Sequence, residues 1–147
     1  MSKLFIYYTH TGNGDLVAET MRSKGYEIRK ITPRRDLPRS FVLSILKGGF
    51  LAGVGHSSKL VGYNSDVSGY DRVAIGSPVW NGKLSCPINT VLEQTDLEGK
   101  DAVFILYSGG GNAPKAVNKL NERYGCPVIE LREPSKNAAE LEKLAGL

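Results

Sequence analysis

The stretch that decides the fold is residues 4–14, LFIYYTHTGNG, in which five apolar or aromatic residues run into a short polar loop with two glycines. Two other stretches have the same form: residues 73–82, VAIGSPVWNG, and residues 103–112, VFILYSGGGN. Each is typical of a buried strand followed by a loop of small residues. If the three strands are parallel neighbours, their loops meet at the carboxyl edge of one sheet. Open α/β sheets bind their ligands at that edge.

Apolar runs and helical patterns alternate along the chain. Strands are expected at Lys3–Tyr8, Tyr26–Ile31, Arg72–Gly76, Ala102–Tyr107 and Pro127–Leu131, and helices at Asp15–Lys24, Pro87–Gln94, Ala113–Tyr124 and Lys136–Leu144. Tyr7, Tyr8 and Tyr107 lie within these strands and are expected in the core. This alternation predicts parallel βαβ units with right-handed crossovers, and 147 residues are close to the usual size of one domain. The sequence therefore predicts an α/β fold in a single domain, residues 1–147.

The connection between the second and third expected strands, residues 32–71, is unusually long. Only residues 38–47 or a little beyond read as helix, and the stretch after them is rich in glycine. A connection of this length often carries function, such as a lid or a docking surface. A crossover helix with a flexible tail is the alternative.

Composition excludes several classes of protein. The longest apolar run near mid-chain, residues 41–55, contains Lys47 and is shorter than the roughly 20 residues that span a bilayer. No secretory signal follows Met1, so we expect a cytoplasmic protein without a membrane anchor. Cys86 and Cys126 each precede a proline and show no pairing or metal-ligand pattern, so neither a disulfide nor a metal site is expected.

The charge is uneven along the chain. Residues 1–62 hold ten Lys and Arg against four Asp and Glu, which gives +6, whereas residues 63–147 hold nine against eleven, which gives −2. The basic excess could attract acidic proteins or phosphorylated ligands. No aromatic residues interleave with these charges on a recognisable motif, so no nucleic-acid partner is expected.

The first loop has the composition of an anion site. A turn of Thr, Gly and Asn between a strand and a helix aims several backbone N–H groups at one point, and the helix dipole favours an anion there. The hydroxyls of Thr9 and Thr11 and the side chain of Asn13 would add donors. The P-loop pattern G-x-x-x-x-G-K-[ST] is absent, and the first loop lacks the last glycine of G-x-G-x-x-G. The loop therefore predicts a phosphate site but disfavours a dinucleotide fold.

Taken together, the three loops resemble those of the flavodoxin family. Thr-x-Thr-Gly-Asn after the first strand is similar to the flavodoxin phosphate-binding loop. Residues 76–82, GSPVWNG, followed by residues 86–89, CPIN, are similar to the G-[ST]-P-x-[WY]-x-G…P-[VI] segment, and residues 108–111, SGGG, are similar to the Gly-rich third loop. The resemblance covers the chain from residue 3 to about residue 144, and it implies a doubly wound five-stranded parallel sheet in the order 2-1-3-4-5.

The resemblance also implies FMN as cofactor, bound at the carboxyl edge, and it implies which residues bind it. The phosphate would be wrapped by Thr9, His10, Thr11, Gly12, Asn13 and Gly14. The isoalloxazine ring would be lined by the second loop, Ser77, Pro78, Val79, Trp80, Asn81 and Gly82, with Trp80 stacked on the ring or edging one face. The pyrimidine end would be approached by Ser108, Gly109, Gly110, Gly111 and Asn112. No catalytic residue of the protein is implied, since FMN itself carries the redox chemistry.

The chain departs from the flavodoxin pattern at three points. Gly14 stands where flavodoxins usually place Thr or Ser, the third loop has neither a Tyr nor an acidic cluster, and the sequence pI is about 9.1.

Two functions stay open. One is an electron carrier between a reductase and an acceptor protein, and the other is an FMN-dependent oxidoreductase that reduces quinones or other small acceptors with NAD(P)H. The intact loops support both, family and size favour the carrier, and the missing Tyr and basic charge favour the enzyme.

We expect the Asn81–Gly82 peptide to rotate when the flavin is reduced. When the flavin is reduced its N5 gains a proton, and a nearby carbonyl could turn to accept a hydrogen bond from it. Asn and Gly both tolerate positive φ, so this peptide is suited to such a rotation. A tight turn that does not move is the alternative.

Overall fold

The structure, a computed structural model, describes residues 1–33 and 59–147. The helix expected at residues 38–47 and the Gly-rich stretch after it lie outside these described residues. The strands are β1 (Lys3–Tyr7), β2 (Tyr26–Lys30), β3 (Arg72–Trp80), β4 (Lys83–Leu84), β5 (Asp101–Ser108) and β6 (Val128–Arg132). The helices are α1 (Asn13–Ser23), α4 (Cys86–Gln94), α5 (Pro114–Tyr124) and a 3-10 helix, η1 (Ala138–Leu144).

The main sheet is parallel and runs in the order β2-β1-β3-β5-β6. Without the short β4, which pairs only with β3, this is the expected order 2-1-3-4-5. The predicted doubly wound α/β fold is therefore confirmed. The strand order reverses between β1 and β3, so the fold has its topological switch point there.

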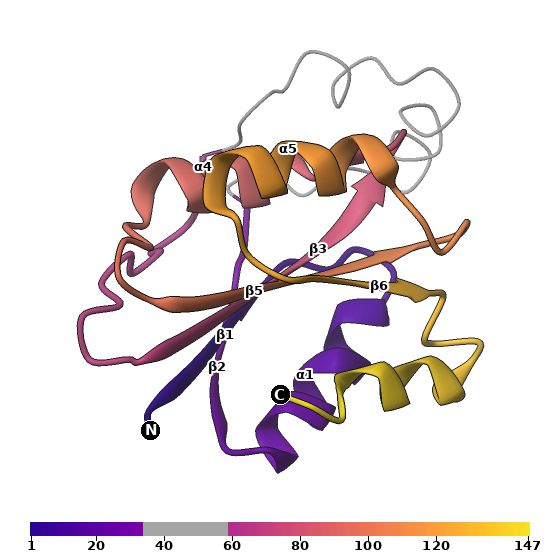
Figure 1. Cartoon of the computed structure of the whole chain (residues 1–147), viewed down its shortest axis with the longest axis horizontal. Helices are drawn as coiled ribbons and strands as arrows, with labels where there is room; N and C mark the ends of the chain where they lie inside the picture. The colour runs from indigo at the N-terminus through magenta and orange to yellow at the C-terminus, as the bar shows by residue number, and fades with distance from the viewer. Residues whose placement is uncertain (34–58) are drawn as a thin grey trace.

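Helices cover both faces of the sheet, with α4 and α5 on one face and α1 and η1 on the other (Figure 1). Because side chains alternate along a strand, β1 serves two cores at once. Leu4 and Ile6 belong to the cluster that includes Ile88 of α4, whereas Phe5 belongs to the cluster that includes Val17 of α1. Strands buried on both faces need nearly continuous apolar runs, which is the pattern that the sequence shows.

Strand β3 is longer than the sequence predicted. It was expected to end at Gly76, with a loop over residues 77–82, but it continues to Trp80 and turns back into β4. The reason is the pair Asn81 and Gly82, whose φ angles of 51° and 74° form a two-residue turn. Such turns match the twist of a hairpin, and Asn-Gly is their preferred sequence.

The last helix is a 3-10 helix over Ala138–Leu144 and begins two residues later than expected. Leucines are spaced by three within this helix and just after it: Leu144 is fully buried, and Leu141 and Leu147 pack against the same cluster. A helix with three residues per turn aligns side chains at this spacing on one side. The spacing therefore favours the tighter helix.

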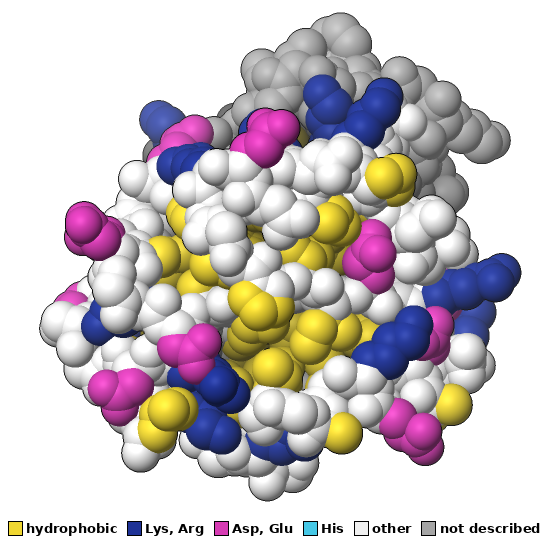
Figure 2. Space-filling view, in the orientation of Figure 1, with side chains coloured by type: hydrophobic (Ala, Val, Ile, Leu, Met, Phe, Trp, Pro, Cys, Tyr) yellow, Lys and Arg dark blue, Asp and Glu magenta, His cyan; other side chains and the backbone are white. Residues whose placement is uncertain are grey.

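Hydrophobic side chains gather in the middle of one face of the molecule (Figure 2). They lie over β6, the last strand of the sheet, where Val128 and Ile129 are partly buried against opposite core clusters. Charged side chains surround them. An edge strand with flanking charges resists pairing with other strands.

None of the described helices is long and apolar enough to cross a membrane. Within residues 1–33 and 59–147, no three His, Cys, Asp or Glu side chains cluster as they would around a metal ion. Cys86 and Cys126 are free thiols, the first buried and the second partly buried.

Candidate functional site

The strand register brings the three predicted loops to one edge of the sheet. Strands β1, β3 and β5 are parallel neighbours, with Tyr7 opposite Gly76 and Pro78 opposite Tyr107. Residues 9–14, the turn at 81–82 and residues 108–112 therefore all lie at the carboxyl edge, beside the switch point. Below, residues 9–14 are called the first loop and residues 108–112 the third loop.

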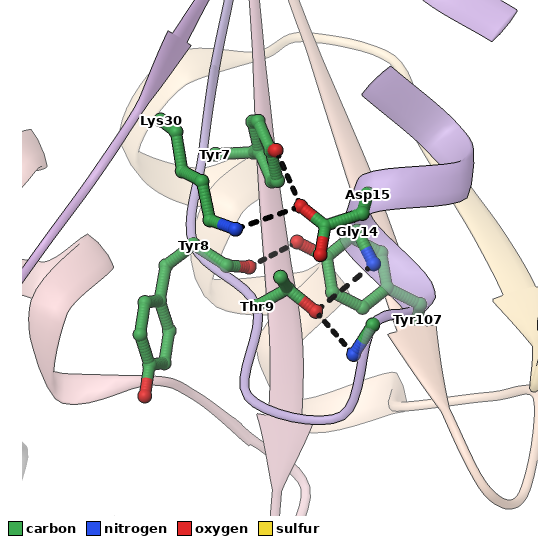
Figure 3. A network of polar contacts seen from close by, with 8 residues as sticks. Tyr7, Tyr8, Thr9, Gly14, Asp15, Lys30 and Tyr107 are labelled. Atoms are coloured by element: carbon green, nitrogen blue, oxygen red, sulfur yellow. Dashed lines mark hydrogen bonds and ion pairs between the residues drawn. The ribbon is translucent and has the colours of Figure 1, made fainter. Parts of the chain in front are cut away.

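The first loop is folded around the hydroxyl of Thr9. This oxygen accepts hydrogen bonds from the backbone N–H of Gly12, at 3.2 Å, and of Gly14, at 3.0 Å (Figure 3). Two of the amides that the sequence predicted for an anion are thus held by Thr9 in this structure. Thr11 is exposed and His10 is partly buried. Hydrogen bonds between its own residues therefore hold the loop in its shape.

Helix α1 starts at the end of this loop. Gly12 has a φ of 92°, and its carbonyl accepts hydrogen bonds from the N–H groups of Asp15 and Leu16. The carboxamide oxygen of Asn13 accepts a hydrogen bond of 3.0 Å from the N–H of Ser135, in the turn after β6. The start of the helix is thus tied to a segment more than a hundred residues away in the chain.

Gly14 lies in a space that allows no side chain. A Cβ at this position would lie 2.6 Å from the hydroxyl of Tyr107, 2.8 Å from Cβ of Thr9 and 2.8 Å from the ring of Tyr7. The hydroxyl of Tyr107 donates a hydrogen bond to the carbonyl of Tyr8 (Figure 3). The absence of Thr or Ser at residue 14 is therefore explained by packing, because tyrosine rings and Thr9 fill the space.

Tyr7 and Tyr107 are 4% and 2% exposed, which confirms that they belong to the core. Nothing in the sequence indicates that they also support the first loop. The hydroxyl of Tyr7 donates to Asp15 at 2.6 Å, and Nζ of Lys30 lies 2.9 Å from the same carboxylate oxygen (Figure 3). Burial acts to raise the pKa of Asp15, but the hydrogen bonds from Tyr7 and Lys30 outweigh it and lower that pKa below its ordinary value. Desolvation by burial, with the bond to Asp15, raises the pKa of the Tyr7 hydroxyl.

Asp15 and Lys30 form a charge pair at the start of α1. A carboxylate in the first turn interacts favourably with the helix dipole. It would also repel an anion bound at the same helix end, and Lys30 offsets that charge. Neither residue was selected from the sequence, and the signal that could have found Asp15 is its place in the first turn, directly after the loop.

The second segment is a hairpin rather than a loop. The hydroxyl of Ser77 is buried, lies 3.0 Å from the hydroxyl of Ser85 and accepts a hydrogen bond from the Ser85 N–H at 3.2 Å. Ser77 thus fastens the base of the hairpin to the start of α4. Pro78 is partly exposed, Val79 is 9% exposed, and Asn81 at the tip is exposed.

Trp80 is buried in this structure. Its side chain is 3% exposed and meets Tyr8 edge to face, with ring centroids 6.0 Å apart. It belongs to the cluster that also contains residues of α4 and α5. The indole is thus part of the hydrophobic core that lies beneath the carboxyl edge of the sheet.

The third loop is open. Gly109, Gly110 and Asn112 are exposed, and a Cβ on Gly109 would meet no atom within 4 Å. The loop is closed at its base by Ser108, whose hydroxyl accepts a 2.9 Å hydrogen bond from the Gly111 N–H. Backbone amides in such a loop can approach a ligand closely because no side chain intervenes.

The chain matches one protein-family model and is similar to several solved structures. The model of a flavodoxin family matches residues 55–142. No curated protein matches the chain. The solved structure of a candidate flavoprotein from Bacteroides eggerthii is similar to it with a TM-score of 0.74 and 22% identity, covering 98% of each chain.

Two further structures share the fold. A flavoprotein from Lactobacillus acidophilus, solved in complex with FMN, has 24% identity and a TM-score of 0.61 over 94% of this chain and 97% of its own. An NADPH-quinone reductase from P. pentosaceus has 8% identity and a TM-score of 0.51 over 99% of this chain and 95% of its own. At these identities the likeness establishes the fold alone.

Proposed function

We propose, from the premise that this chain belongs to the flavodoxin family, that it binds FMN at the carboxyl edge of its sheet and transfers electrons through it. The observation that carries the proposal is the convergence of the first loop, the Asn81–Gly82 turn and the third loop at the switch point. The similar flavoprotein from Lactobacillus acidophilus, which was crystallised with FMN, supports it. Bound FMN would supply the redox chemistry, since flavins exchange electrons singly or in pairs.

The first loop suits a phosphate group. It leads into the N-terminus of α1, where the helix dipole favours a dianion, and it carries the exposed hydroxyl of Thr11. Thr9 holds the amides of Gly12 and Gly14 in place. Lys30 neutralises Asp15, so the one carboxylate of this turn does not oppose the phosphate. We assign residues 9–14 to the phosphate.

The hairpin and the third loop suit a flat ring. The exposed glycines of the third loop leave backbone groups open to ring oxygens and nitrogens. The Asn81–Gly82 turn already has both residues at positive φ, so its peptide can rotate without steric cost from Gly82. We assign residues 77–82 and 108–112 to the ring, with Trp80 and Ser77 beneath it.

A second function is favoured by the third loop. Gly109 and Gly110 are exposed and the loop has no Tyr, so a small acceptor could reach one face of the ring. An FMN-dependent oxidoreductase that uses NAD(P)H to reduce quinones or similar acceptors would use that access. We favour the carrier on the basis of the family, and the two functions differ in their reaction with NADPH.

The deciding experiment is an anaerobic, stepwise reduction of the protein loaded with FMN, followed by its visible spectrum and repeated with NADPH as the sole reductant. The carrier is expected to take up electrons in two separated one-electron steps and to react with NADPH only slowly. Rapid NADPH oxidation by the protein alone would instead establish the enzyme. Failure to bind FMN would overturn both.

The position of the phosphate can be tested with two matched lysines. Lys30 of β2 lies over the ring of Tyr7 on β1, and Lys3 of β1 lies over the ring of Tyr26 on β2, at the other end of the same strand pair. Replacement of Lys30 by Met should raise the Kd for FMN several-fold and leave the Kd for riboflavin unchanged, because only FMN carries the phosphate. The Lys3→Met protein should bind both as the wild type does. Equal losses for FMN and riboflavin in Lys30→Met would contradict the assignment.

A further inference from the structure

Strand β6 is the last strand of the described sheet, and its backbone groups alternate between two sides. The N–H of Phe104 donates to the carbonyl of Pro127, and the N–H of Glu133 donates to the carbonyl of Ser108. In a parallel ladder every second residue directs both its N–H and its carbonyl to the neighbouring strand, so the odd-numbered residues of β6 face β5. The residues that turn both groups outward, away from β5, are therefore Val128, Glu130 and Arg132.

Two of these outward groups are held by side chains of η1. Oε1 of Glu140 accepts a hydrogen bond of 3.2 Å from the N–H of Arg132. Nζ of Lys143 donates a hydrogen bond of 3.3 Å to the carbonyl of Glu130 and lies 2.6 Å from Oε2 of Glu140. A 3-10 helix places residues that are three apart on one side, so both side chains reach the same edge. The hydrogen bond from Lys143 lowers the pKa of the Glu140 carboxyl, so the pair stays charged at neutral pH.

Apolar side chains flank the same edge. Val128 and Ile129 are partly buried against opposite core clusters, and Leu141 and Leu147 are partly buried against the cluster of Ile129. Figure 2 shows the hydrophobic side chains that gather over this strand. A second strand at this edge would cover them. An open edge beside apolar surface is a template for pairing with another chain.

The sequence of β6 is complementary to itself in the antiparallel direction. If Glu130 of one copy lies opposite Arg132 of a second copy, the two-fold axis gives the same charge pair twice. Both residues turn their backbone groups outward, so they can form the hydrogen-bonded pairs of an antiparallel ladder. Their side chains share one face of the sheet, since they are two residues apart in a strand. Opposite charges directly across two strands stabilise such a pairing.

We propose that η1 closes this edge: the Glu140–Lys143 pair occupies the outward N–H of Arg132 and the outward carbonyl of Glu130, and thereby prevents β6 from pairing with β6 of a second copy. Strand pairing would use the same N–H and the same carbonyl, so a second copy can bind only after the two side chains have left. None of these groups belongs to the residues assigned to FMN, so the edge and the cofactor can be tested separately.

The test is to remove the pair and to measure association of the full chain. The double variant Glu140→Ala, Lys143→Ala keeps the net charge, and alanine is compatible with a helix. Sedimentation equilibrium at increasing protein concentration, with FMN and without it, should show a monomeric wild type. In the double variant the Kd of the dimer is expected to fall about tenfold or more below the wild-type value or its lower limit, because two hydrogen bonds no longer have to be broken. Lys143→Met, which keeps the stem of the side chain but not the donor, should lower this Kd by a smaller factor.

The matched control is the double variant Glu133→Ala, Lys136→Ala. These two residues also form an ion pair at a spacing of three, with 3.2 Å between Nζ and Oε1, and they lie in the turn between β6 and η1. Their removal again leaves the net charge unchanged, and the protein should remain a monomer. Unfolding curves for both double variants show whether the chain stays folded.

A third change tests the proposed register. Arg132→Glu, added to Glu140→Ala and Lys143→Ala, places like charges opposite each other in the pairing and should restore the monomer. Amide hydrogen exchange shows where the copies meet. In the Glu140→Ala, Lys143→Ala protein, exchange at Glu130 should slow as the protein concentration rises, whereas exchange at Ile129, which faces β5, should not change.

The outcomes are distinct. A folded Glu140→Ala, Lys143→Ala protein that stays monomeric would refute the proposal, and so would equal dimerisation of the control. Dimers that persist after Arg132→Glu, or that form without slower exchange at Glu130, would show that the copies meet at another surface and would also overturn it. If loss of the pair unfolds the chain, sedimentation of Lys143→Met decides alone, and a Kd equal to that of the wild type refutes the proposal.

Discussion

The first and third loops leave the same edge of the same sheet, yet they are built in opposite ways. The first is packed from below: a Cβ on Gly14 would meet three side chains at 2.6 to 2.8 Å. The third is open, and a Cβ on Gly109 would meet nothing within 4 Å. Glycine in the first loop is required by crowding, whereas glycine at the tip of the third leaves backbone accessible. The proposed phosphate end is thus fixed by the protein core, while the proposed ring end depends on an uncovered main chain.

The largest effect is expected from Gly14→Ala. The added methyl would overlap Tyr107, Thr9 and Tyr7, so the core or the loop must shift, at a cost of about 3 kcal/mol in the free energy of unfolding. Gly110→Ala is the matched control, because the nearest atom to its Cβ is Oδ1 of Asn112 at 4.0 Å, and it should cost less than about 0.5 kcal/mol. Urea unfolding measures both, and equal losses would remove the contrast between the loops.

The next effect tests whether the third loop is open throughout. Gly111 has a φ of 78°, and its Cβ would lie 2.9 Å from Cβ of Arg132. Gly111→Ala should therefore destabilise the fold by about 2 kcal/mol, mainly from the left-handed backbone. Gly109→Ala in the same loop should be nearly neutral. If Gly111→Ala lowers the free energy of unfolding no more than Gly109→Ala does, a side chain is accommodated as easily at the base of the loop as at its tip.

A smaller effect is expected at Thr9. Thr9→Val keeps the shape but removes the oxygen that accepts from Gly12 and Gly14, which should cost about 1–2 kcal/mol and weaken FMN more than riboflavin. Thr9→Ser keeps the oxygen and should retain most of the stability and the FMN preference. Calorimetric unfolding with paired flavin titrations distinguishes the variants. A Ser variant as impaired as Val would show that the methyl group, not the hydroxyl, holds the loop.

The smallest effect is electrostatic and concerns Asp15, in the first turn of α1 directly after the first loop; the third loop has no ionisable side chain. Hydrogen bonds from Tyr7 and Lys30 overcome the effect of burial and lower the pKa of Asp15 in the folded state. Its stabilising contribution is therefore complete above its unfolded pKa, about 3.9, and is lost as the pH falls through the lower folded value. Asp15→Asn should flatten the loss of stability below about pH 4 in acid unfolding curves. An acid limb that is unchanged in Asp15→Asn would show that the pair contributes nothing.

Most of the fold could be predicted from the sequence because its signals are local. Buried parallel strands are nearly continuous apolar runs, and the glycine and threonine loops mark their ends, so the strands and the loops at the carboxyl edge followed. The strand order was implied by the resemblance of the three loops to those of flavodoxins. The end of β3 was placed too early because Ser77 and Pro78 read as loop residues. The Asn-Gly pair between Val79-Trp80 and Lys83-Leu84 is a hairpin signal that could have corrected it.

The support beneath the site could not be predicted. Tyr107 and Gly14 come into contact only when β1 and β5 have paired on either side of β3. No local sequence pattern near either residue predicts this contact. The same holds for Asn13 and Ser135. The 3-10 helix at the end was missed for another reason, since a leucine spacing of three is compatible with both kinds of helix over so short a segment.

The tie between Asn13 and Ser135, together with the bond from Tyr107 to Tyr8, has a consequence for the order of assembly. The residues of the first loop are synthesised well before Tyr107 and Ser135, which hold them. Contacts between such distant positions form late in folding because long stretches of chain must first be closed. A nascent chain therefore lacks these two supports of the first loop until β5 and the turn after β6 have emerged, so capture of the proposed cofactor is expected only after both have been synthesised.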